Sequence, residues 1–422
     1  MNNTTWKRQF NILWVGQVFM LAILGMSLPY WPLYIEELGN FTPGEIRIWS
    51  AALCVAPFIT AILCAPIWGK IGDKFGYKPM VLRACVGIFL TQTLILLFTD
   101  VWFILFFRVL QGILGGFIVS AQAFALAMTN DQERGTTLGK LQSATAIAAI
   151  LGPMLGGVIA GFAGYQAIFI AASVISGIVT VIFFIFLKDV PKAAKKPALT
   201  GAKPVSIFQK KILVILLVIS MIQLAEQMIT PVFALFVSDQ LGADGILVGF
   251  LYAAPGFMIF ALAPYWGKLV DKMTQRGYSI YYFIAALLFS SAALQVLHAY
   301  AETVTAVFAL RALWGICLGA LLPLLLRILV DNVDPSERGA FLGFGNSASK
   351  FGTVLGILCG ATTEAYFGYS NSFIIMGIMY FIAGIIMLAA NPNKKMFRPY
   401  NGNNLRKFSV DSFSTVSNGT PR

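Results

Sequence analysis

The chain has 422 residues, of which 58% are hydrophobic and only 11% are charged, and its mean hydropathy is +0.79. Water-soluble domains carry about 25% charged residues, so this composition excludes a soluble globular protein and indicates one that resides in a lipid bilayer. The formal net charge of +12 is scattered over short segments between apolar runs, a distribution that argues against nucleic-acid binding.

Long apolar runs predict transmembrane helices, because about 20 helical residues cross a hydrocarbon core of roughly 30 Å. No signal-peptide cleavage site follows the first run, so we interpret that run as a membrane anchor. The sequence contains twelve such runs, near residues 11–34, 47–68, 80–98, 102–127, 137–161, 166–187, 212–237, 246–266, 279–298, 303–328, 341–366 and 370–390.

Basic residues alternate from one connection to the next. Lys and Arg concentrate at Lys7 and Arg8 and in segments 69–79, 129–136, 188–211, 267–277, 329–339 and the tail after 391. The opposite connections hold Arg47 as their only basic residue, among several acids. The positive-inside rule therefore predicts an integral multi-pass protein with both termini in the cytoplasm, as in a bacterial inner membrane.

The two halves of the chain repeat one another. Pro57 and Pro66 recur 198 positions later as Pro255 and Pro264. After a turn that is longer in the second half, Arg108 and Gly112 recur 203 positions later as Arg311 and Gly315. Parallel repeats of this kind place a substrate path between the halves. We therefore predict an N-terminal six-helix bundle at 1–187, a cytoplasmic linker at 188–211, a C-terminal six-helix bundle at 212–390 and a disordered cytoplasmic tail at 391–422.

Three motifs in this repeat carry a family resemblance. Residues 69–78 read GKIGDKFGYK with a weaker copy at 267–278, residues 108–112 read RVLQG, and residues 152–157 read GPMLGG. They resemble the helix 2–3 loop signature of the major facilitator superfamily, its helix 4 motif, and the helix 5 motif of its drug:proton antiporter branch. The resemblance implies an all-α membrane protein with twelve transmembrane helices in two pseudo-symmetric six-helix bundles.

The resemblance also implies roles for these motifs. The first is expected to form a conformational latch, made of Gly69, Gly72, Asp73, Gly76, Lys78 and, in the weaker copy, Asp271. A tight turn with Asp73 as a helix cap explains the same residues without a latch. The helix 5 motif, Gly152, Pro153, Gly156 and Gly157, is expected to bend its helix and admit a helix of the other half, although packing alone explains the glycines too.

Charged residues inside the predicted spans are costly and are candidates for function. Glu226 is the only carboxylate near the middle of a span, so it is the first candidate for proton coupling, followed by Arg108 and Lys350. Alternatively, Arg108 is a structural cation and Glu226 forms a permanent ion pair with Lys350. Many proton-driven exporters of this family carry an acid in helix 1, whereas residues 21–34 contain none, so either Glu226 has taken over that task or proton coupling is absent.

An apolar cavity with a few amides and one acid suits amphipathic or cationic organic compounds. Aromatic residues in such a chain are equally typical of packing or of lipid contact. The candidates for lining the cavity are Gln17, Tyr30, Gln111, Gln142, Gln223, Gln227, Tyr252, Phe257 and Asn346.

These features predict a secondary active transporter that works by alternating access, with proton-coupled efflux of amphipathic or cationic drugs from the cytoplasm. The alternatives are a dedicated exporter of a metabolite such as a siderophore and a proton-coupled importer of a small solute. We expect no enzymatic activity, metal or cofactor, because the chain has a single histidine, His298, and neither an HExxH nor a GxSxG motif. The expected partners are a small-molecule substrate, protons and membrane lipids, with the protein acting as a monomer.

Overall fold

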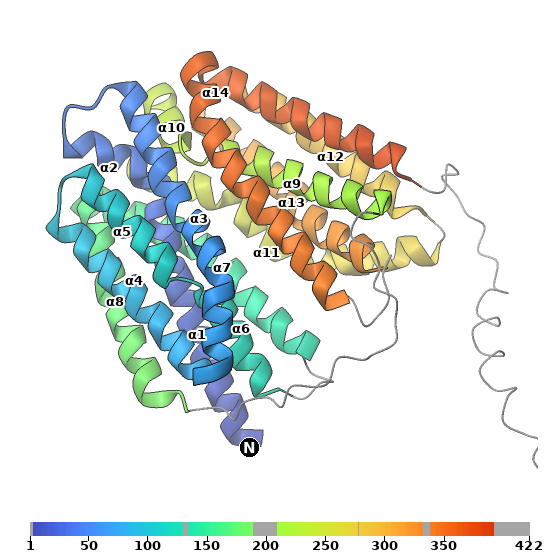
Figure 1. Cartoon of the computed structure of the whole chain (residues 1–422). Helices are drawn as coiled ribbons and strands as arrows, with labels where there is room; N and C mark the ends of the chain where they lie inside the picture. The colour runs from blue at the N-terminus through green and yellow to red at the C-terminus, as the bar shows by residue number, and fades with distance from the viewer. Residues whose placement is uncertain (1–2, 130–133, 189–208, 277, 332–337, 392–422) are drawn as a thin grey trace, which may run out of the picture.

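The computed structural model describes residues 3–129, 134–188, 209–276, 278–331 and 338–391. The predicted linker and the predicted tail lie almost entirely outside these residues, so the expectations for them remain predictions. Within the described part, the chain is folded into helices joined by short turns (Figure 1).

The N-terminal half contains α1 (Asn3–Ser27), the 3₁₀ turn η1 (Leu28–Tyr30), α2 (Trp31–Leu38), α3 (Pro43–Phe75), α4 (Tyr77–Leu97), α5 (Val101–Leu114), α6 (Phe117–Ala127), α7 (Arg134–Ala163) and α8 (Tyr165–Phe186). The C-terminal half contains α9 (Lys210–Met228), α10 (Phe233–Leu241), α11 (Gly245–Gln275), α12 (Ile280–His298), α13 (Val304–Asp331) and α14 (Arg338–Ala389).

Eleven segments of the described chain are long and apolar enough to cross a membrane, and the last of them, Phe341–Ala389, has 49 residues. A helix of that length would extend about 70 Å, more than twice the hydrocarbon thickness. The chain instead turns at Gly368, whose φ of 75° ends one helix and starts the next. Figure 1 shows α14 folding back on itself, so the described chain makes the twelve predicted crossings.

Three of the crossings are interrupted within their length. The first is interrupted at η1 and the seventh at residues 229–232, and both breaks contain prolines, Pro29 and Pro231, whose missing N–H interrupts the helical hydrogen bonds. The fourth breaks between α5 and α6 at Gly116, which has a φ of +90°. The predicted spans located these crossings without showing that they are discontinuous.

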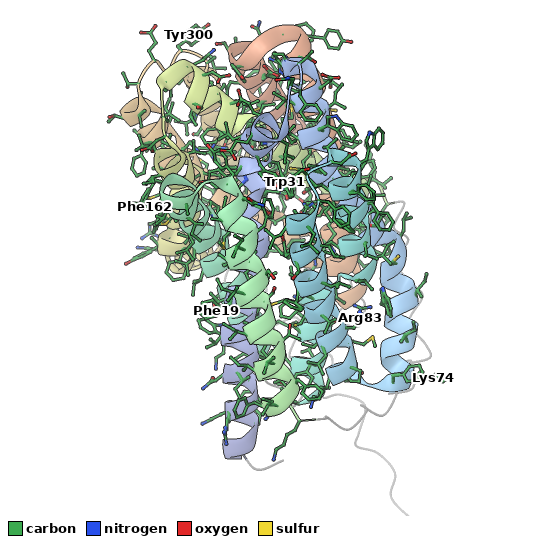
Figure 2. All side chains as sticks on the ribbon, turned by 90° about the vertical axis from the view of Figure 1, so that its left-hand side faces the viewer. Phe19, Trp31, Lys74, Arg83, Phe162 and Tyr300 are labelled. Atoms are coloured by element: carbon green, nitrogen blue, oxygen red, sulfur yellow. The ribbon has the colours of Figure 1, made fainter. Side chains whose placement is uncertain are left out.

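The two ends of the bundle differ in charge. We call the end that carries Lys7, Arg8 and the turn between α3 and α4 the basic end, and the opposite end the acidic end. Figure 2 shows Lys74 at the basic end and Tyr300 at the acidic end. The acidic end holds Glu36, Glu37, Glu45, Asp100, Asp239, Asp244 and Glu302.

Among the residues that the structure describes, the two halves share a core at the acidic end. α7 packs against α11 and α3 packs against α14 across the boundary between the halves. One apolar cluster combines Trp31 and Ile35 of α2 with Phe233 and Phe236 of α10. Toward the basic end each half has its own separate cluster. The halves are therefore joined at the acidic end, and toward the basic end the described apolar residues of each half pack in their own cluster.

Candidate functional site

A cavity of about 330 Å³ lies between the two halves, on the basic side of their shared core. Its two walls differ in chemistry. The N-terminal wall is almost wholly apolar and consists of Leu21, Gly25, Leu28, Ile118, Thr145, Ala149 and Pro153. The C-terminal wall carries nearly all the polar groups and consists of Glu226, Gln227, Ile229, Thr230, Tyr252, Pro255, Gly256, Ile259, Arg311, Trp314 and Leu318.

Glu226 lies in the last turn of α9, immediately before the break in the seventh crossing. Its Oε2 accepts a hydrogen bond of 2.6 Å from Nε2 of Gln223. Ser349 of α14 in turn donates to Oε1 of Gln223 over 3.0 Å. The carboxylate is thus held against the C-terminal wall, with an amide that is itself oriented by a neighbouring helix.

Arg311 is the cation that lines the cavity together with Glu226, and the anticipated ion pair between Glu226 and Lys350 does not form in this structure. Lys350 lies exposed on α14, whereas Arg311 is 5% exposed and lines the cavity. Glu226 and Arg311 lie 85 positions apart in the chain, so no local pattern in the sequence links them.

Arg311 is held by a hydrogen bond and by contacts with aromatic rings. Its Nε donates to the backbone carbonyl oxygen of Leu251 over 2.7 Å, and its guanidinium carbon lies 4.0 Å from the centroid of the Phe233 ring. Residue 255, whose N–H would normally satisfy the Leu251 carbonyl in α11, is a proline. Arg311 therefore supplies the hydrogen bond that Pro255 cannot.

The N-terminal half repeats this arrangement. Nε of Arg108 donates to the carbonyl oxygen of Leu53 over 2.7 Å, and Pro57 stands four residues after Leu53. The guanidinium carbon of Arg108 lies 5.1 Å from the centroid of the Trp31 ring. A Cβ added to Gly112 would collide with the backbone of Pro57, and one added to Gly315 would collide with that of Pro255. Each Arg–Gly pair thus docks on a proline-interrupted helix.

The two arginines differ in their remaining partners. Nη1 of Arg108 donates to Oε1 of Gln111 over 2.5 Å. In the register that aligns Arg108 with Arg311, the position of Gln111 is taken by Trp314, which has no hydrogen-bond acceptor of that kind. The hydrogen bonds of Arg108 are all made within the N-terminal half, and this side chain does not line the cavity. Arg311 lines the cavity together with Glu226.

Tyr30 joins the halves directly. Its hydroxyl lies 3.1 Å from the carbonyl oxygen of Pro153 in α7 and 3.1 Å from that of Gly245 in α11. It is 1% exposed and lies in the shared core instead of lining the cavity. The hydroxyl proton is positioned to bridge two helices that belong to different halves.

A second contact between the halves is an ion pair of Arg47 in α3 and Glu364 in α14. The Glu364 side chain is only 2% exposed and that of Arg47 is 23% exposed. Sequence analysis singled out neither residue as functional, although Arg47 is the only basic residue in the connections of the acidic end. The position of Arg47 among acidic residues was the signal in the sequence that could have indicated an ion pair.

The helix 5 motif lies at two interfaces of α7. A Cβ at Gly152 or Gly156 would collide with carbonyl oxygens of α1, and a Cβ at Gly157 would collide with the backbone of α11 and the hydroxyl of Tyr30. Two of the glycines therefore allow close packing within the N-terminal half and one allows close packing between the halves. Pro153 lines the cavity.

Of the latch residues, the structure describes Gly72, Gly76 and Lys78 in full. α3 continues to Phe75, so Gly69, Gly72 and Asp73 are helical, and the turn consists of Gly76 alone, with a φ of 100°. Gly76, and not Asp73, is the N-cap residue of α4. Nζ of Lys78 donates to the carbonyl oxygen of Phe184 over 3.1 Å. The side chains of Asp73 and Asp271 lie outside the described atoms, so their roles remain predictions.

The remaining candidates have other surroundings. Nε2 of Gln17 donates to the carbonyl oxygen of Leu141 over 2.8 Å, which fixes α1 to α7 within one half. The cavity lining includes Gln227 and Tyr252 and omits Gln17, Gln111, Gln142, Gln223, Phe257 and Asn346. Thr230 and Trp314, which sequence analysis did not select, do line it. The only sign in the sequence that Thr230 could line the cavity was its position beside Pro231.

This arrangement of twelve crossings in two halves around a central cavity is that of a membrane transporter, not of an enzyme. The chain belongs to the Major Facilitator Superfamily, whose sequence model matches residues 13–222 and 215–413. The structure is also similar to a bacterial homologue of the lysosomal transporter Spinster in an inward-facing and occupied conformation, with a TM-score of 0.76 and 14% identity, covering 90% of this chain and 96% of that one. A D-xylose–proton symporter gives a TM-score of 0.72 at 15% identity, covering 92% and 98%. At these identities the likeness shows a shared fold.

Curated relatives match nearly the whole chain. The staphyloferrin B transporter of Staphylococcus aureus is 30% identical over 399 residues, covering 92% of this chain and 94% of that protein. The multidrug resistance protein MdtG of Proteus mirabilis is 30% identical over 397 residues, covering 91% and 94%. MdtG of Escherichia coli is 30% identical over 415 residues, covering 97% of both chains.

Proposed function

We propose that this transporter exports amphipathic organic compounds, cationic ones in particular, in exchange for protons. The observation that carries the proposal is the one-sided cavity, in which Glu226 and Arg311 share the C-terminal wall and face an apolar N-terminal wall. The relationship to proteins named for multidrug resistance supports a substrate of this class.

The walls of the cavity suit a molecule with one polar end. A volume of about 330 Å³ lies at the lower end of the range for small-molecule sites. An apolar body would rest on Leu21 and Ile118 while its polar end reached Glu226 and Gln227. A substrate held by hydrogen bonds to one half travels with that half, so the other half rotates without breaking them.

Glu226 offers a simple means of coupling. The ionised carboxylate attracts a cationic substrate, and the protonated form does not. Arg311 on the same wall competes with the substrate for that negative charge. Proton binding and cation binding at Glu226 therefore exclude one another, which is the condition that antiport requires.

Orientation follows from charge. We place the basic end and both termini in the cytoplasm of a bacterial cell, with the protein in the inner membrane as a monomer surrounded by lipid. The structure, joined at the acidic end, is then an inward-facing state. The bundles 1–187 and 212–390 are the two bodies that rock about the cavity, with 188–211 as their linker.

Asp73 keeps the role implied by the family resemblance. We expect Asp73→Asn to reduce transport strongly while the amount of protein in the membrane stays near normal, and Asp271→Asn to have a smaller effect. Normal transport by both variants would remove the latch from the mechanism.

One observation favours a dedicated exporter of a metabolite such as a siderophore. Arg311 presents a positive charge to the cavity, which suits a substrate with carboxylates, and the relative in Staphylococcus aureus is named for a siderophore. A proton-coupled importer of a small solute uses the same cavity with the opposite direction of net flux.

Transport in proteoliposomes with an imposed proton gradient tests these proposals. A fluorescent lipophilic cation serves as the probe, and the direction of its uphill movement against the proton gradient distinguishes antiport from symport. Glu226→Gln should abolish uphill movement and leave downhill exchange of a neutral amphipathic substrate intact. Glu302→Gln, which alters an exposed carboxylate at the acidic end, is the matched control.

Uphill transport by a well-folded Glu226→Gln protein, with unchanged dependence on the proton gradient, rejects Glu226 as the coupling site. A wild-type protein that ignores the cation yet moves a polycarboxylate favours the metabolite exporter. In that case Arg311→Gln should lose more transport than Glu226→Gln.

A further inference from the structure

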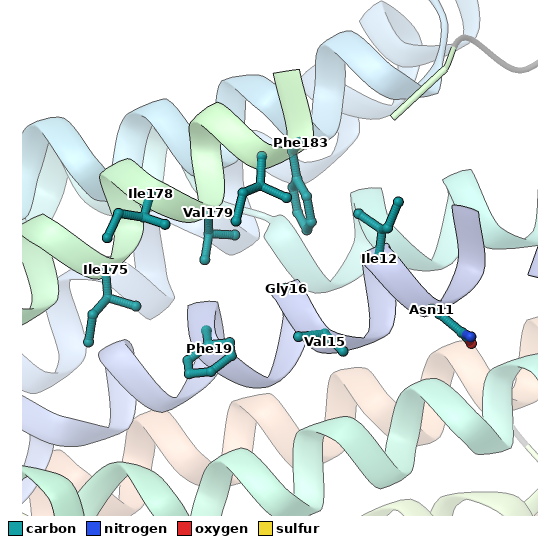
Figure 3. A pocket seen from close by; sticks show the side chains of 10 residues that line it. Asn11, Ile12, Val15, Gly16, Phe19, Ile175, Ile178, Val179 and Phe183 are labelled. Atoms are coloured by element: carbon teal, nitrogen blue, oxygen red, sulfur yellow. The ribbon is translucent and has the colours of Figure 1, made fainter. Parts of the chain in front are cut away.

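A second hollow lies between α1 and α8, outside the central cavity (Figure 3). Its volume is about 510 Å³. The side chains around it are apolar except for Asn11 at one end, and they are Asn11, Ile12, Val15, Gly16, Phe19, Ile175, Ile178, Val179, Ile182 and Phe183. We call this hollow the α1–α8 groove.

The groove lies on the surface of the N-terminal half that faces the membrane. Phe19 is 44% exposed and Ile178 is 54% exposed, and both belong to membrane-spanning segments. In Figure 2 the Phe19 side chain points outward beside α8. α1 contributes other residues, Leu21 and Gly25, to the central cavity, so the groove and the cavity use different faces of this helix.

Packing fixes the shape of the groove. Phe183 is fully buried against Gly16, where an added Cβ would collide with its ring. At the basic end of the groove, Nε2 of Gln9 donates to the carbonyl oxygen of Phe186 over 2.9 Å. The N–H of Lys188 donates to Oε1 of Gln9, also over 2.9 Å. These two bonds join the start of α1 to the end of α8, so the groove exists before any ligand arrives.

Two basic residues lie beyond the apolar lining of the groove, toward the basic end. Lys7 and Arg8 stand four residues before Asn11 and Ile12, so they lie on the same face of α1, one turn beyond the apolar lining. Both side chains are exposed. The groove is thus an apolar channel in the membrane with two cations at the level where lipid headgroups lie.

We propose that the α1–α8 groove binds an anionic phospholipid, with an acyl chain along Val15 and Ile178 and the phosphate group held by Lys7 and Arg8. A zwitterionic lipid fills the same channel but lacks a net charge to pair with the two cations. A cationic drug suits the apolar lining but is repelled by Lys7 and Arg8. The charge at the rim therefore selects the occupant.

Native mass spectrometry of the full-length protein in detergent tests the proposal, with titrations of phosphatidylglycerol and phosphatidylcholine. Phosphatidylglycerol should bind to the wild type, and Lys7→Gln/Arg8→Gln should weaken that binding roughly 30-fold, which is about 2 kcal/mol for two basic residues. Lys210→Gln/Lys211→Gln removes two exposed cations from the same end of the other half and should leave the binding unchanged.

The apolar channel has a matched test of its own. Ile178→Phe fills the groove and should reduce binding of phosphatidylglycerol, whereas Val181→Phe, at a site of nearly equal exposure on α8, should not. Equal binding of both lipids by the wild type overturns the proposal. So does unchanged binding to Ile178→Phe, or displacement of phosphatidylglycerol by the lipophilic cation used in the transport assay.

Discussion

Arg311 donates a hydrogen bond to the backbone carbonyl oxygen of Leu251, which the proline four residues later leaves without its helical partner. Arg108 and Leu53 form the same pair in the other half. An unsatisfied carbonyl in a membrane-spanning helix costs several kcal/mol, so each arginine stabilises its own half. This contribution of each arginine to stability is separate from any role in proton coupling, and it can be measured as a change in the free energy of unfolding.

Restoring the backbone N–H that Pro57 lacks should reduce the contribution of Arg108 to stability. Arg108→Gln alone is expected to cost about 1–3 kcal/mol of stability, because it leaves the Leu53 carbonyl unpaired. In a Pro57→Ala background the cost should fall by about 1 kcal/mol or more, since the backbone then supplies the donor. Unfolding by denaturant in detergent micelles gives the four free energies of the cycle.

The control for this cycle is Pro66→Ala, which restores an N–H elsewhere in α3 and should leave the cost of Arg108→Gln unchanged. Purely additive effects of Arg108→Gln and Pro57→Ala would show that the arginine does not act through the Leu53 carbonyl.

Removing the Tyr30 hydroxyl should loosen the acidic end. Tyr30→Phe deletes a hydrogen bond between the halves, worth about 0.5–1.5 kcal/mol, and should raise the population opened at that end by roughly 2- to 10-fold. Distances between spin labels at Asp100 and Gln240 report the opening. Tyr34→Phe, at a buried tyrosine for which the described chain shows no hydrogen bond, should leave the distances as in the wild type.

Neutralising only Arg47 of the ion pair with Glu364 should open the acidic end more than neutralising both residues. Arg47→Gln leaves a buried carboxylate unpaired and should favour opening of the acidic end, which hydrates that group. Arg47→Gln/Glu364→Gln removes both charges and should restore closure. Accessibility of a cysteine introduced near α10 to a membrane-impermeant reagent measures the opening. If the double variant opens as much as the single one, the ion pair does not hold this end closed.

The proposed orientation in the membrane predicts which sites an external reagent reaches. Single cysteines at Asp100 or Gln240 should be labelled in intact cells, and a cysteine at Lys195 should be labelled only after the membrane is permeabilised. Labelling of position 195 in intact cells would invert the topology and turn the joined acidic end toward the cytoplasm.

The sequence by itself determined the features that arise from local composition and repetition. Apolar runs gave the twelve crossings, because each needs only enough length to span the bilayer. The recurrence of Pro57 as Pro255, 198 positions later, and of Arg108 as Arg311, 203 positions later, indicated two related halves. Glu226 and the two arginines could also be recognised as candidates, because a charged side chain inside a membrane span is unfavourable in free energy whichever way it points.

Only the tertiary structure decided which of these groups meet. In the fold Glu226 lines the cavity together with Arg311, whereas Lys350 is exposed on α14. The fold also places the Tyr30 hydroxyl within reach of two helices from different halves. Such contacts join residues more than 80 positions apart, so no local pattern encodes them. They depend on how close two helix backbones approach, and that distance is set by glycines such as Gly157, whose missing Cβ allows α7 and α11 to touch.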